Sequence, residues 1–182
     1  MDILLQQILN GLVLGSIYAL IALGYTMVYG IMGLINFAHG EVTMIGAMVT
    51  ISVLGVFSSM GLALPGPVLV LMALMVAVPT CMLVGFLIER VAYRPLRNAP
   101  RLAPLITAIG LSIVLQNVAI LIWGRNYIPF PPLLPHDPID IMGASITDLQ
   151  IFIIISAVVI MAGLLFMVEK TKLGRAMRAT SQ

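Results

Sequence analysis

Apolar residues form five long runs along the chain, and the segments between the runs hold most of the charged and proline residues. The runs cover residues 8–28, 42–60, 68–88, 102–123 and 149–168. A helix that crosses a bilayer needs about 20 apolar residues, so each run has the length of one span. Backbone groups facing lipid must be hydrogen-bonded, and the runs lack the alternation of barrel strands. The pattern therefore predicts an all-α, polytopic integral membrane protein with about five transmembrane helices.

The composition narrows the class of protein further. Of the 182 residues, 61% are hydrophobic and 9% are charged. Soluble domains carry about 25% charged residues, so these few charges could not cover a water-facing surface. The composition excludes a soluble domain, a disordered chain and a nucleic-acid binder. No Lys or Arg precedes the first run, so we expect the first helix to be retained rather than cleaved as a signal peptide.

Basic residues predict the orientation of the later spans. They gather in two segments, Arg90, Arg94, Arg97 and Arg101 in the first and Lys170, Lys172, Arg175 and Arg178 in the second. Cytoplasmic loops are enriched in Lys and Arg. We therefore expect the segment from Arg90 to Arg101 and the C-terminus to be cytoplasmic, with two spans between them. The orientation of the N-terminus follows only from counting helices back from Arg90.

The connection after the fourth run is rich in proline and aspartate and is expected on the outer side of the membrane. Because proline fixes φ and lacks an N–H donor, this connection is predicted to be extended rather than helical. Ser145 or Thr147 is expected to cap the fifth helix at its start.

Asn36, His39 and Glu41 form an unusual polar cluster between the first two runs, in the string GLINFAHGE. The cluster contains no Lys or Arg although helix counting puts it on the cytoplasmic side, so we expect part of it at membrane depth. Ionisable residues there indicate a functional site, and His39 with Glu41 would suit a proton relay, an ion site or a gate. The alternative is a helix break at the interface, with Glu41 in a first turn where the helix dipole favours an acid.

Gln116 and Asn117 are adjacent polar residues inside the fourth run. We expect their amides to hydrogen-bond across helices, or alternatively to line a polar path.

Small residues predict close packing at two places. Gly11, Gly15 and Ala19 are four residues apart, which puts them on one helix face and predicts packing between helices of this chain. Cys81, the single cysteine, lies within the third run and is expected to be a small packing residue.

The sequence contains none of the common catalytic motifs. There is no Gly-Lys pair and hence no P-loop, no G-x-S-x-G or H-E-x-x-H string, and no Cys and His residues at metal-ligand spacing. We therefore expect no catalytic, cofactor-binding or metal-binding residues. An intramembrane enzyme would need a nucleophile–base or metal constellation that is not visible here.

Three strings carry a family resemblance. They are GLINFAHGEVTMIGA at 33–47, ERVAYRPLRNAPRLAPLITAIGLSIVLQN at 89–117 and KTKLGRAMRATSQ at 170–182. In this order they resemble the branched-chain amino acid ABC transporter permeases of the LivH type. The resemblance implies a permease subunit of a binding-protein-dependent importer in the cytoplasmic (inner) membrane.

The resemblance also implies the partners of the chain. These are a LivM-like permease, LivG- and LivF-like ATPase subunits and a periplasmic receptor for leucine, isoleucine or valine, with membrane lipid around the helices. ATP would be bound by the ATPase subunits, so the chain itself would need no cofactor and would not be an enzyme. Lys172, Arg175 and Arg178 would lead into the ATPase-side contact, or alternatively would anchor the chain at the cytoplasmic face.

Permeases of this type continue beyond the LGRAMRA segment. Residues 1–182 are therefore expected to form a single transmembrane permease domain that is incomplete at its C-terminus. Three other interpretations remain open: an importer of urea or short amides, an ion-coupled carrier or channel using His39 and Glu41, and a truncated, non-transporting product with an assembly role.

Overall fold

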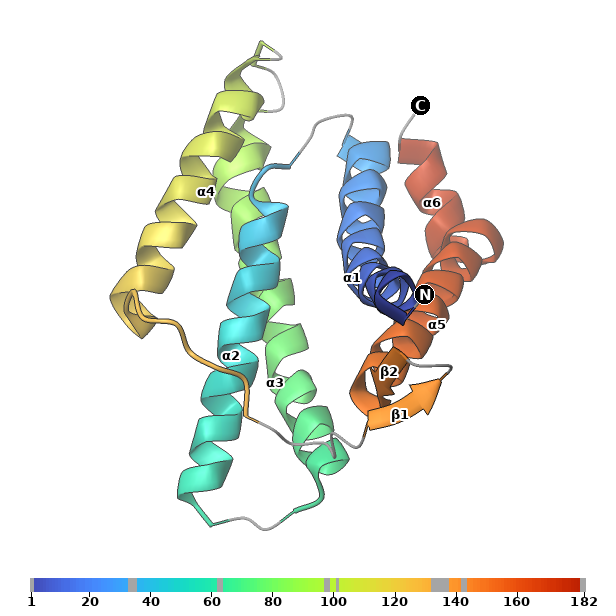
Figure 1. The fold of residues 1–182 in the computed structure, drawn as a ribbon. Helices are drawn as coiled ribbons and strands as arrows, with labels where there is room; N and C mark the ends of the chain where they lie inside the picture. The colour runs from blue at the N-terminus through green and yellow to red at the C-terminus, as the bar shows by residue number, and fades with distance from the viewer. Residues whose placement is uncertain are drawn as a thin grey trace. The chain divides into compact units, whose positions relative to one another are not determined.

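Five long apolar helices dominate the computed structural model (Figure 1). It describes the backbone of residues 2–32, 36–61, 64–96, 99–100, 102–131, 138–141 and 144–180. The helices are α1 (Asp2–Met32), α2 (His39–Ser59), α3 (Gly66–Leu87), α4 (Leu102–Trp123) and α5 (Asp148–Lys170). By length and composition each could cross a membrane, which confirms the predicted fold class.

Shorter elements join these helices, and the hydrophobic pattern did not predict them. They are the π-helical turn η1 (Ile88–Tyr93), the 3₁₀ turn η2 (Arg94–Leu96), the antiparallel strands β1 (Pro138–Ile141) and β2 (Ala144–Thr147), and the helix α6 (Lys172–Thr180). The strands lie in the proline-rich connection, where an extended segment was expected.

The chain divides into two compact units. One unit, Asn36–Leu133, contains α2, α3, the turns η1 and η2, and α4. The other unit combines Met1–Ile35 with Leu134–Gln182 and contains α1, the strands, α5 and α6.

In the first of these units, α2 and α3 approach closely at Gly46. A Cβ atom at Gly46 would lie 2.8 Å from the Sγ atom of Cys81, so the glycine makes room for the thiol. The thiol in turn donates to the carbonyl of Val42 at 3.6 Å. Cys81 is therefore a small packing residue, as predicted.

In the other unit, α1 holds the edge of strand β2. The Gln6 side chain donates to the Ser145 carbonyl at 3.0 Å and accepts from the Ser145 N–H at 2.9 Å. It thus pairs with the strand as a neighbouring strand would. The chain then enters α5 through a capping box in which Thr147 and Gln150 each bond the other's backbone N–H. The predicted cap is therefore confirmed for Thr147.

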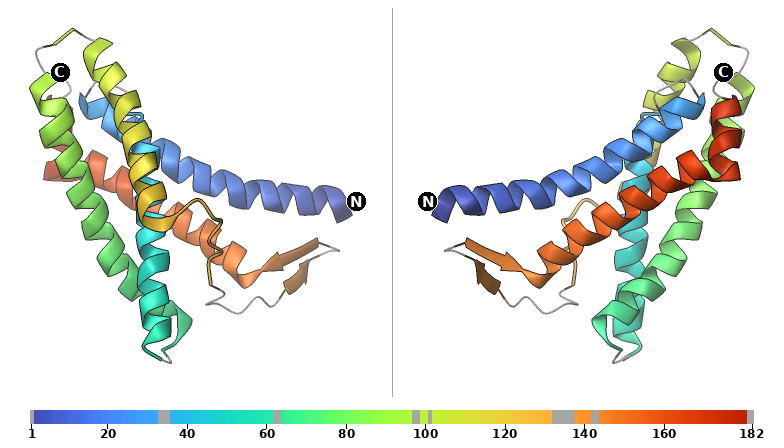
Figure 2. Two further views of the ribbon diagram at one scale, coloured as in Figure 1. Left: turned by 90° about the vertical axis from the view of Figure 1, so that its left-hand side faces the viewer. Right: turned by 90° about the vertical axis from the view of Figure 1, so that its right-hand side faces the viewer.

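Helix α1 is visibly curved in Figure 2. The hydroxyls of Ser16 and Thr26 donate to the Val13 and Leu23 carbonyls, which already lie in the helix ladder. Extra donors of this kind often bend helices. Within its own unit, no described atom lies within 4 Å of a Cβ built at Gly11 or Gly15 on the predicted small face of this helix. Close packing of this face against other helices of the chain stays a prediction.

Helix α6 turns back tightly from the end of α5. Thr171 accepts the backbone N–H of Gly174 at 3.3 Å and so caps α6. Gly174 is buried directly against the backbone of Val168, where a Cβ atom would collide with the carbonyl group. Only glycine fits this corner without movement of α6.

Candidate functional site

The polar segment that precedes α2 is folded by Asn36. Its Oδ1 atom accepts the Ala38 N–H at 3.0 Å, and its carbonyl accepts the His39 N–H at 3.1 Å. Asn and Asp favour such local turns because their side chains reach backbone N–H groups two residues on. The turn satisfies donors that the first turn of a helix leaves unpaired.

Tyr93 ties this turn to the end of α3. Its hydroxyl donates to the same Asn36 Oδ1 atom at 2.7 Å, across 57 residues of chain. The Tyr93 side chain is only 7% exposed and belongs to a buried cluster with Ile88 and Ala108. Tyr93 lies in the π-helical turn η1. Such turns occur frequently at functional sites, which makes this region a candidate site.

Glu41 joins α2 to α4. One carboxylate oxygen, Oε1, accepts both the Ser112 hydroxyl at 2.8 Å and the Gln116 amide at 2.7 Å. The Ser112 hydroxyl oxygen also lies 3.5 Å from the Gln116 amide nitrogen. Glu41 and Ser112 are half-buried, whereas Gln116 is exposed. We call Glu41, Ser112 and Gln116 the carboxylate cluster.

The carboxylate cluster lies beside the middle of α4. At 1.5 Å per residue, Glu41 is about 3 Å from the start of α2, whereas Ser112 and Gln116 are about 15 and 21 Å from the start of α4. Helix α4 accordingly extends past the start of α2 in Figure 1. Ala38, directly before α2, is fully buried. Cover of this kind is what irregular backbone would need if it lay within a bilayer.

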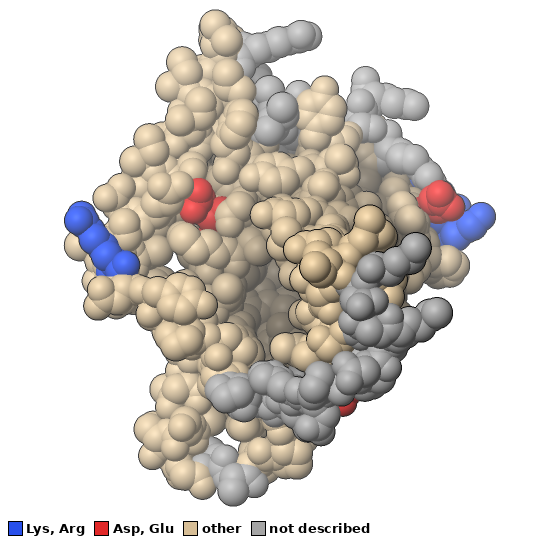
Figure 3. All heavy atoms as spheres, viewed as in Figure 1, with Lys and Arg blue, Asp and Glu red and all other residues tan. Residues whose placement is uncertain are grey.

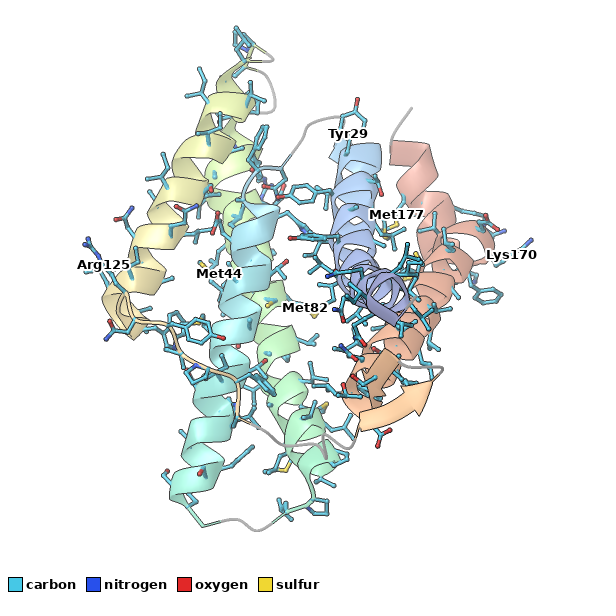
Figure 4. The ribbon with its side chains drawn as sticks, in the orientation of Figure 1. Tyr29, Met44, Met82, Arg125, Lys170 and Met177 are labelled. Carbon is cyan, nitrogen blue, oxygen red and sulfur yellow. The ribbon has the colours of Figure 1, made fainter. Side chains whose placement is uncertain are left out.

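A second polar contact joins the same two helices further along. The Trp123 indole N–H donates to the Ser52 hydroxyl at 2.7 Å. Since Glu41 precedes Ser52 and Gln116 precedes Trp123, α2 and α4 run in the same direction. Met44, labelled in Figure 4, lies one turn after Glu41 on the same side of α2.

The structure brings together most of the predicted site residues, but not all of them. Asn36 and Glu41 flank the start of α2, and His39 is its half-buried first residue. Glu41 does lie in a first turn, as one of the two hypotheses required. The predicted bond between helices is confirmed for Gln116 and wrong for Asn117, which donates to the Ile113 carbonyl of its own helix at 2.8 Å.

Sequence reasoning missed Ser112 and Tyr93. Ser112 lies one helical turn before Gln116, so the four-residue spacing could have indicated a shared face. Tyr93 gave no comparable signal, because its partner Asn36 is far away in the sequence and the π-helical turn was not predicted.

The basic residues lie at the ends of the helices. Lys172 and Arg175 are exposed and three residues apart, so they share one face of α6. Arg90 and Arg94 are exposed in η1 and η2, whereas Arg97, Arg101 and the side chain of Arg178 lie outside the described residues. Two further basic residues, labelled in Figure 4, also lie at helix ends: Lys170 at the end of α5 and Arg125 just past α4.

Charged residues are few on the face drawn in Figure 3. Large apolar side chains on the long helices are instead exposed, among them Leu71, Met75, Leu121 and Phe166. Within the described residues, no group of three or more His, Cys, Asp or Glu side chains could hold a metal ion.

Long apolar helices with outward-facing apolar side chains define an α-helical, multi-pass membrane protein. Residues 7–182 match the family described as "Branched-chain amino acid transport system / permease component", and the chain belongs to this family. The family resemblance seen in the sequence is therefore confirmed.

Relatives with similar sequences are permease proteins of the same kind. The chain is 45% identical to the high-affinity branched-chain amino acid transport system permease protein BraD of Pseudomonas aeruginosa. It is 44% identical to the corresponding permease proteins LivH of Escherichia coli strain K12 and of Salmonella typhimurium. Each similarity covers 98% of this chain, which spans 59% of the length of each relative. No solved structure matches the chain.

Proposed function

We propose that the chain is a transmembrane permease subunit of a binding-protein-dependent ABC importer for branched-chain amino acids. The observation that carries this proposal is the family match over residues 7–182. The names of the relatives supply the solute class. In this proposal both compact units belong to one transmembrane permease domain.

The geometry beside α2 supports a transport role. Helix α2 begins beside the middle of α4, after an irregular segment held by Asn36 and Tyr93. Polar and ionisable residues among membrane-spanning helices commonly mark substrate or ion pathways. We place the transport path near Asn36, His39 and Glu41 on this side and near Gln116 and Asn117 on α4.

The energy for uptake would come from separate ATPase subunits of the LivG and LivF kind. Lys172 and Arg175, together with Arg178, are proposed to face these subunits from α6, where their charges would attract acidic side chains. A LivM-like permease and a periplasmic amino-acid receptor complete the proposed assembly. The segment from Arg90 to Arg101 and the C-terminus would be cytoplasmic in the inner membrane.

Reconstituted transport tests this function. The complex that contains this chain would be placed in proteoliposomes with receptor outside and ATP inside, and uptake of labelled leucine would be followed. We expect uptake that needs ATP and an ATPase competent for hydrolysis, and that isoleucine and valine inhibit.

Three results would contradict the proposal. Inhibition by urea or short amides but not by branched-chain amino acids would assign the importer to those solutes. Uptake driven by a proton gradient without the ATPases would indicate an ion-coupled carrier. An assembled complex without any uptake would indicate a non-transporting subunit.

A further inference from the structure

The carboxylate cluster is rich in hydrogen-bond acceptors. The Ser112 hydroxyl donates its only hydrogen to Oε1 of Glu41, and the Gln116 amide group donates to the same atom. Both bonds end on Oε1 of Glu41, so neither uses Oε2. The second N–H of the Gln116 amide is directed to the Ser112 hydroxyl oxygen at 3.5 Å and occupies one of its two lone pairs. The groups that remain are then acceptors: Glu41 Oε2, the Gln116 carbonyl oxygen and one lone pair of Ser112.

The charge of the carboxylate cluster also favours a ligand that carries hydrogen-bond donors. Glu41 has two described hydrogen-bond partners, Ser112 and Gln116, and both are neutral. A carboxylate at membrane depth is expensive unless a cation or a hydrogen-bonding network compensates it. A positively charged group with several donors would supply that compensation.

The carboxylate cluster is also reachable and fixed in place. Gln116 is exposed and Glu41 is half-buried, so the carboxylate cluster is not sealed off by the described residues. Val42, next to Glu41, packs against the cluster of Ile88, Tyr93 and Ala108, as do Leu111 and Leu115 beside the two partners on α4. The neighbours of all three polar residues are therefore anchored in one apolar core.

We propose that Glu41, Ser112 and Gln116 bind the α-ammonium group of the amino acid as it passes through the permease. A primary ammonium has three N–H donors and one positive charge. Glu41 Oε2, the Gln116 carbonyl and the Ser112 hydroxyl oxygen offer three acceptors, one of them charged. The inference rests on the proposed function, because it assumes that amino acids are the solute.

The first test compares uptake with ATP hydrolysis in the assembled complex. Removing one charge-assisted hydrogen bond predicts a fall in leucine uptake of about tenfold or more in Glu41→Gln. Receptor-stimulated ATP hydrolysis is expected to persist, and Glu41→Asp is expected to restore part of the uptake. The matched control Glu169→Gln, an exposed carboxylate at the end of α5, should behave as wild type.

The second test measures the charge preference of the site without transport. In a Cys81→Ala background with otherwise cysteine-free partners, Ser112→Cys would be labelled with cationic aminoethyl and anionic sulfonatoethyl methanethiosulfonate. We expect the cationic reagent to react about tenfold faster, as an uncompensated nearby carboxylate favours cations. Glu41→Gln should remove this preference. Leucine should protect the thiol, whereas 4-methylpentanoate, which lacks the ammonium group, should not.

The outcomes separate this inference from the proposed function. Wild-type uptake in Glu41→Gln, equal labelling by both reagents, or equal protection by the two solutes would overturn ammonium binding and leave the importer intact. If the wild-type complex takes up no branched-chain amino acid, the proposed function fails first. The labelling ratio then still reports whether the site prefers cations.

Discussion

Asn36 and Glu41 each hold two hydrogen-bond donors on a single side-chain oxygen. Asn36 connects its own turn to Tyr93, and Glu41 connects α2 to α4. A single substitution at either position would therefore leave two donors without their acceptor, on two segments for Asn36 and on α4 alone for Glu41. Leaving a buried donor unpaired costs about 1–3 kcal/mol, so these positions are sensitive.

Tyr93→Phe tests the first of these connections. The substitution keeps the buried ring but removes the hydroxyl that donates to Asn36 at 2.7 Å. We expect the free energy of unfolding to fall by about 1 kcal/mol, the value of a typical hydrogen bond. Thermal unfolding of the purified protein in detergent would measure the change.

Tyr127→Phe is the control for this prediction, because Tyr127 is 90% exposed. It should leave the unfolding temperature unchanged. Equal losses in the two variants would mean that the Tyr93 hydroxyl contributes nothing through Asn36.

Gln116 and Asn117 show what the sequence can reveal about single residues. Their polarity inside an apolar run marked them as unusual, and this could be predicted. Adjacent helical residues point about 100° apart, however, so only one of them faces α2. Which one does so depends on how α4 is rotated against α2, and no local pattern encodes that rotation.

Among the elements, the long helices follow directly from their composition. Each predicted run is long enough that no other backbone structure could satisfy its hydrogen bonds in lipid. The short elements have no such constraint. Helix α6 has only nine residues and carries glycine, a poor helix former, in its first turn, so local propensity argued against it. Its fit against Val168 explains why glycine is nevertheless there.

Gly174→Ala tests that fit. Alanine would collide with the Val168 carbonyl group, so α6 must shift away from α5. We expect faster tryptic cleavage after Lys172 and Arg175, measured by limited proteolysis in detergent.

Gly163→Ala in α5 is the matched control, since nothing described lies within 4 Å of a Cβ there. Alanine should stabilise that helix by up to about 1 kcal/mol without changing cleavage near α6. Unchanged cleavage in Gly174→Ala would mean that α6 is not seated on Val168.

For the molecule as a whole, family membership was predictable because three strings carried it in order. The candidate site was only partly predictable, since it depends on contacts between residues up to 75 positions apart, as in Glu41 and Gln116. Orientation in the membrane depends on where the basic residues lie, and it stays a prediction.

Reporter fusions test that orientation. A phosphatase that is active only outside the cytoplasm should be inactive when fused after Arg97 and active when fused after His136, because basic segments are retained inside. A fluorescent protein that matures only in the cytoplasm should give the opposite pattern at the two positions. The reverse results would invert the proposed topology.

The spacing of Ser112 and Gln116 has a consequence for movement. They are one helical turn apart, and both donate to the same oxygen of Glu41. If α4 slid along α2 by one turn, about 5.4 Å, one of the two donors would still reach that oxygen. The bond between Trp123 and Ser52 has no such substitute and would break. Sliding by one turn would thus keep a hydrogen bond between the helices at Glu41 and lose the one at Ser52.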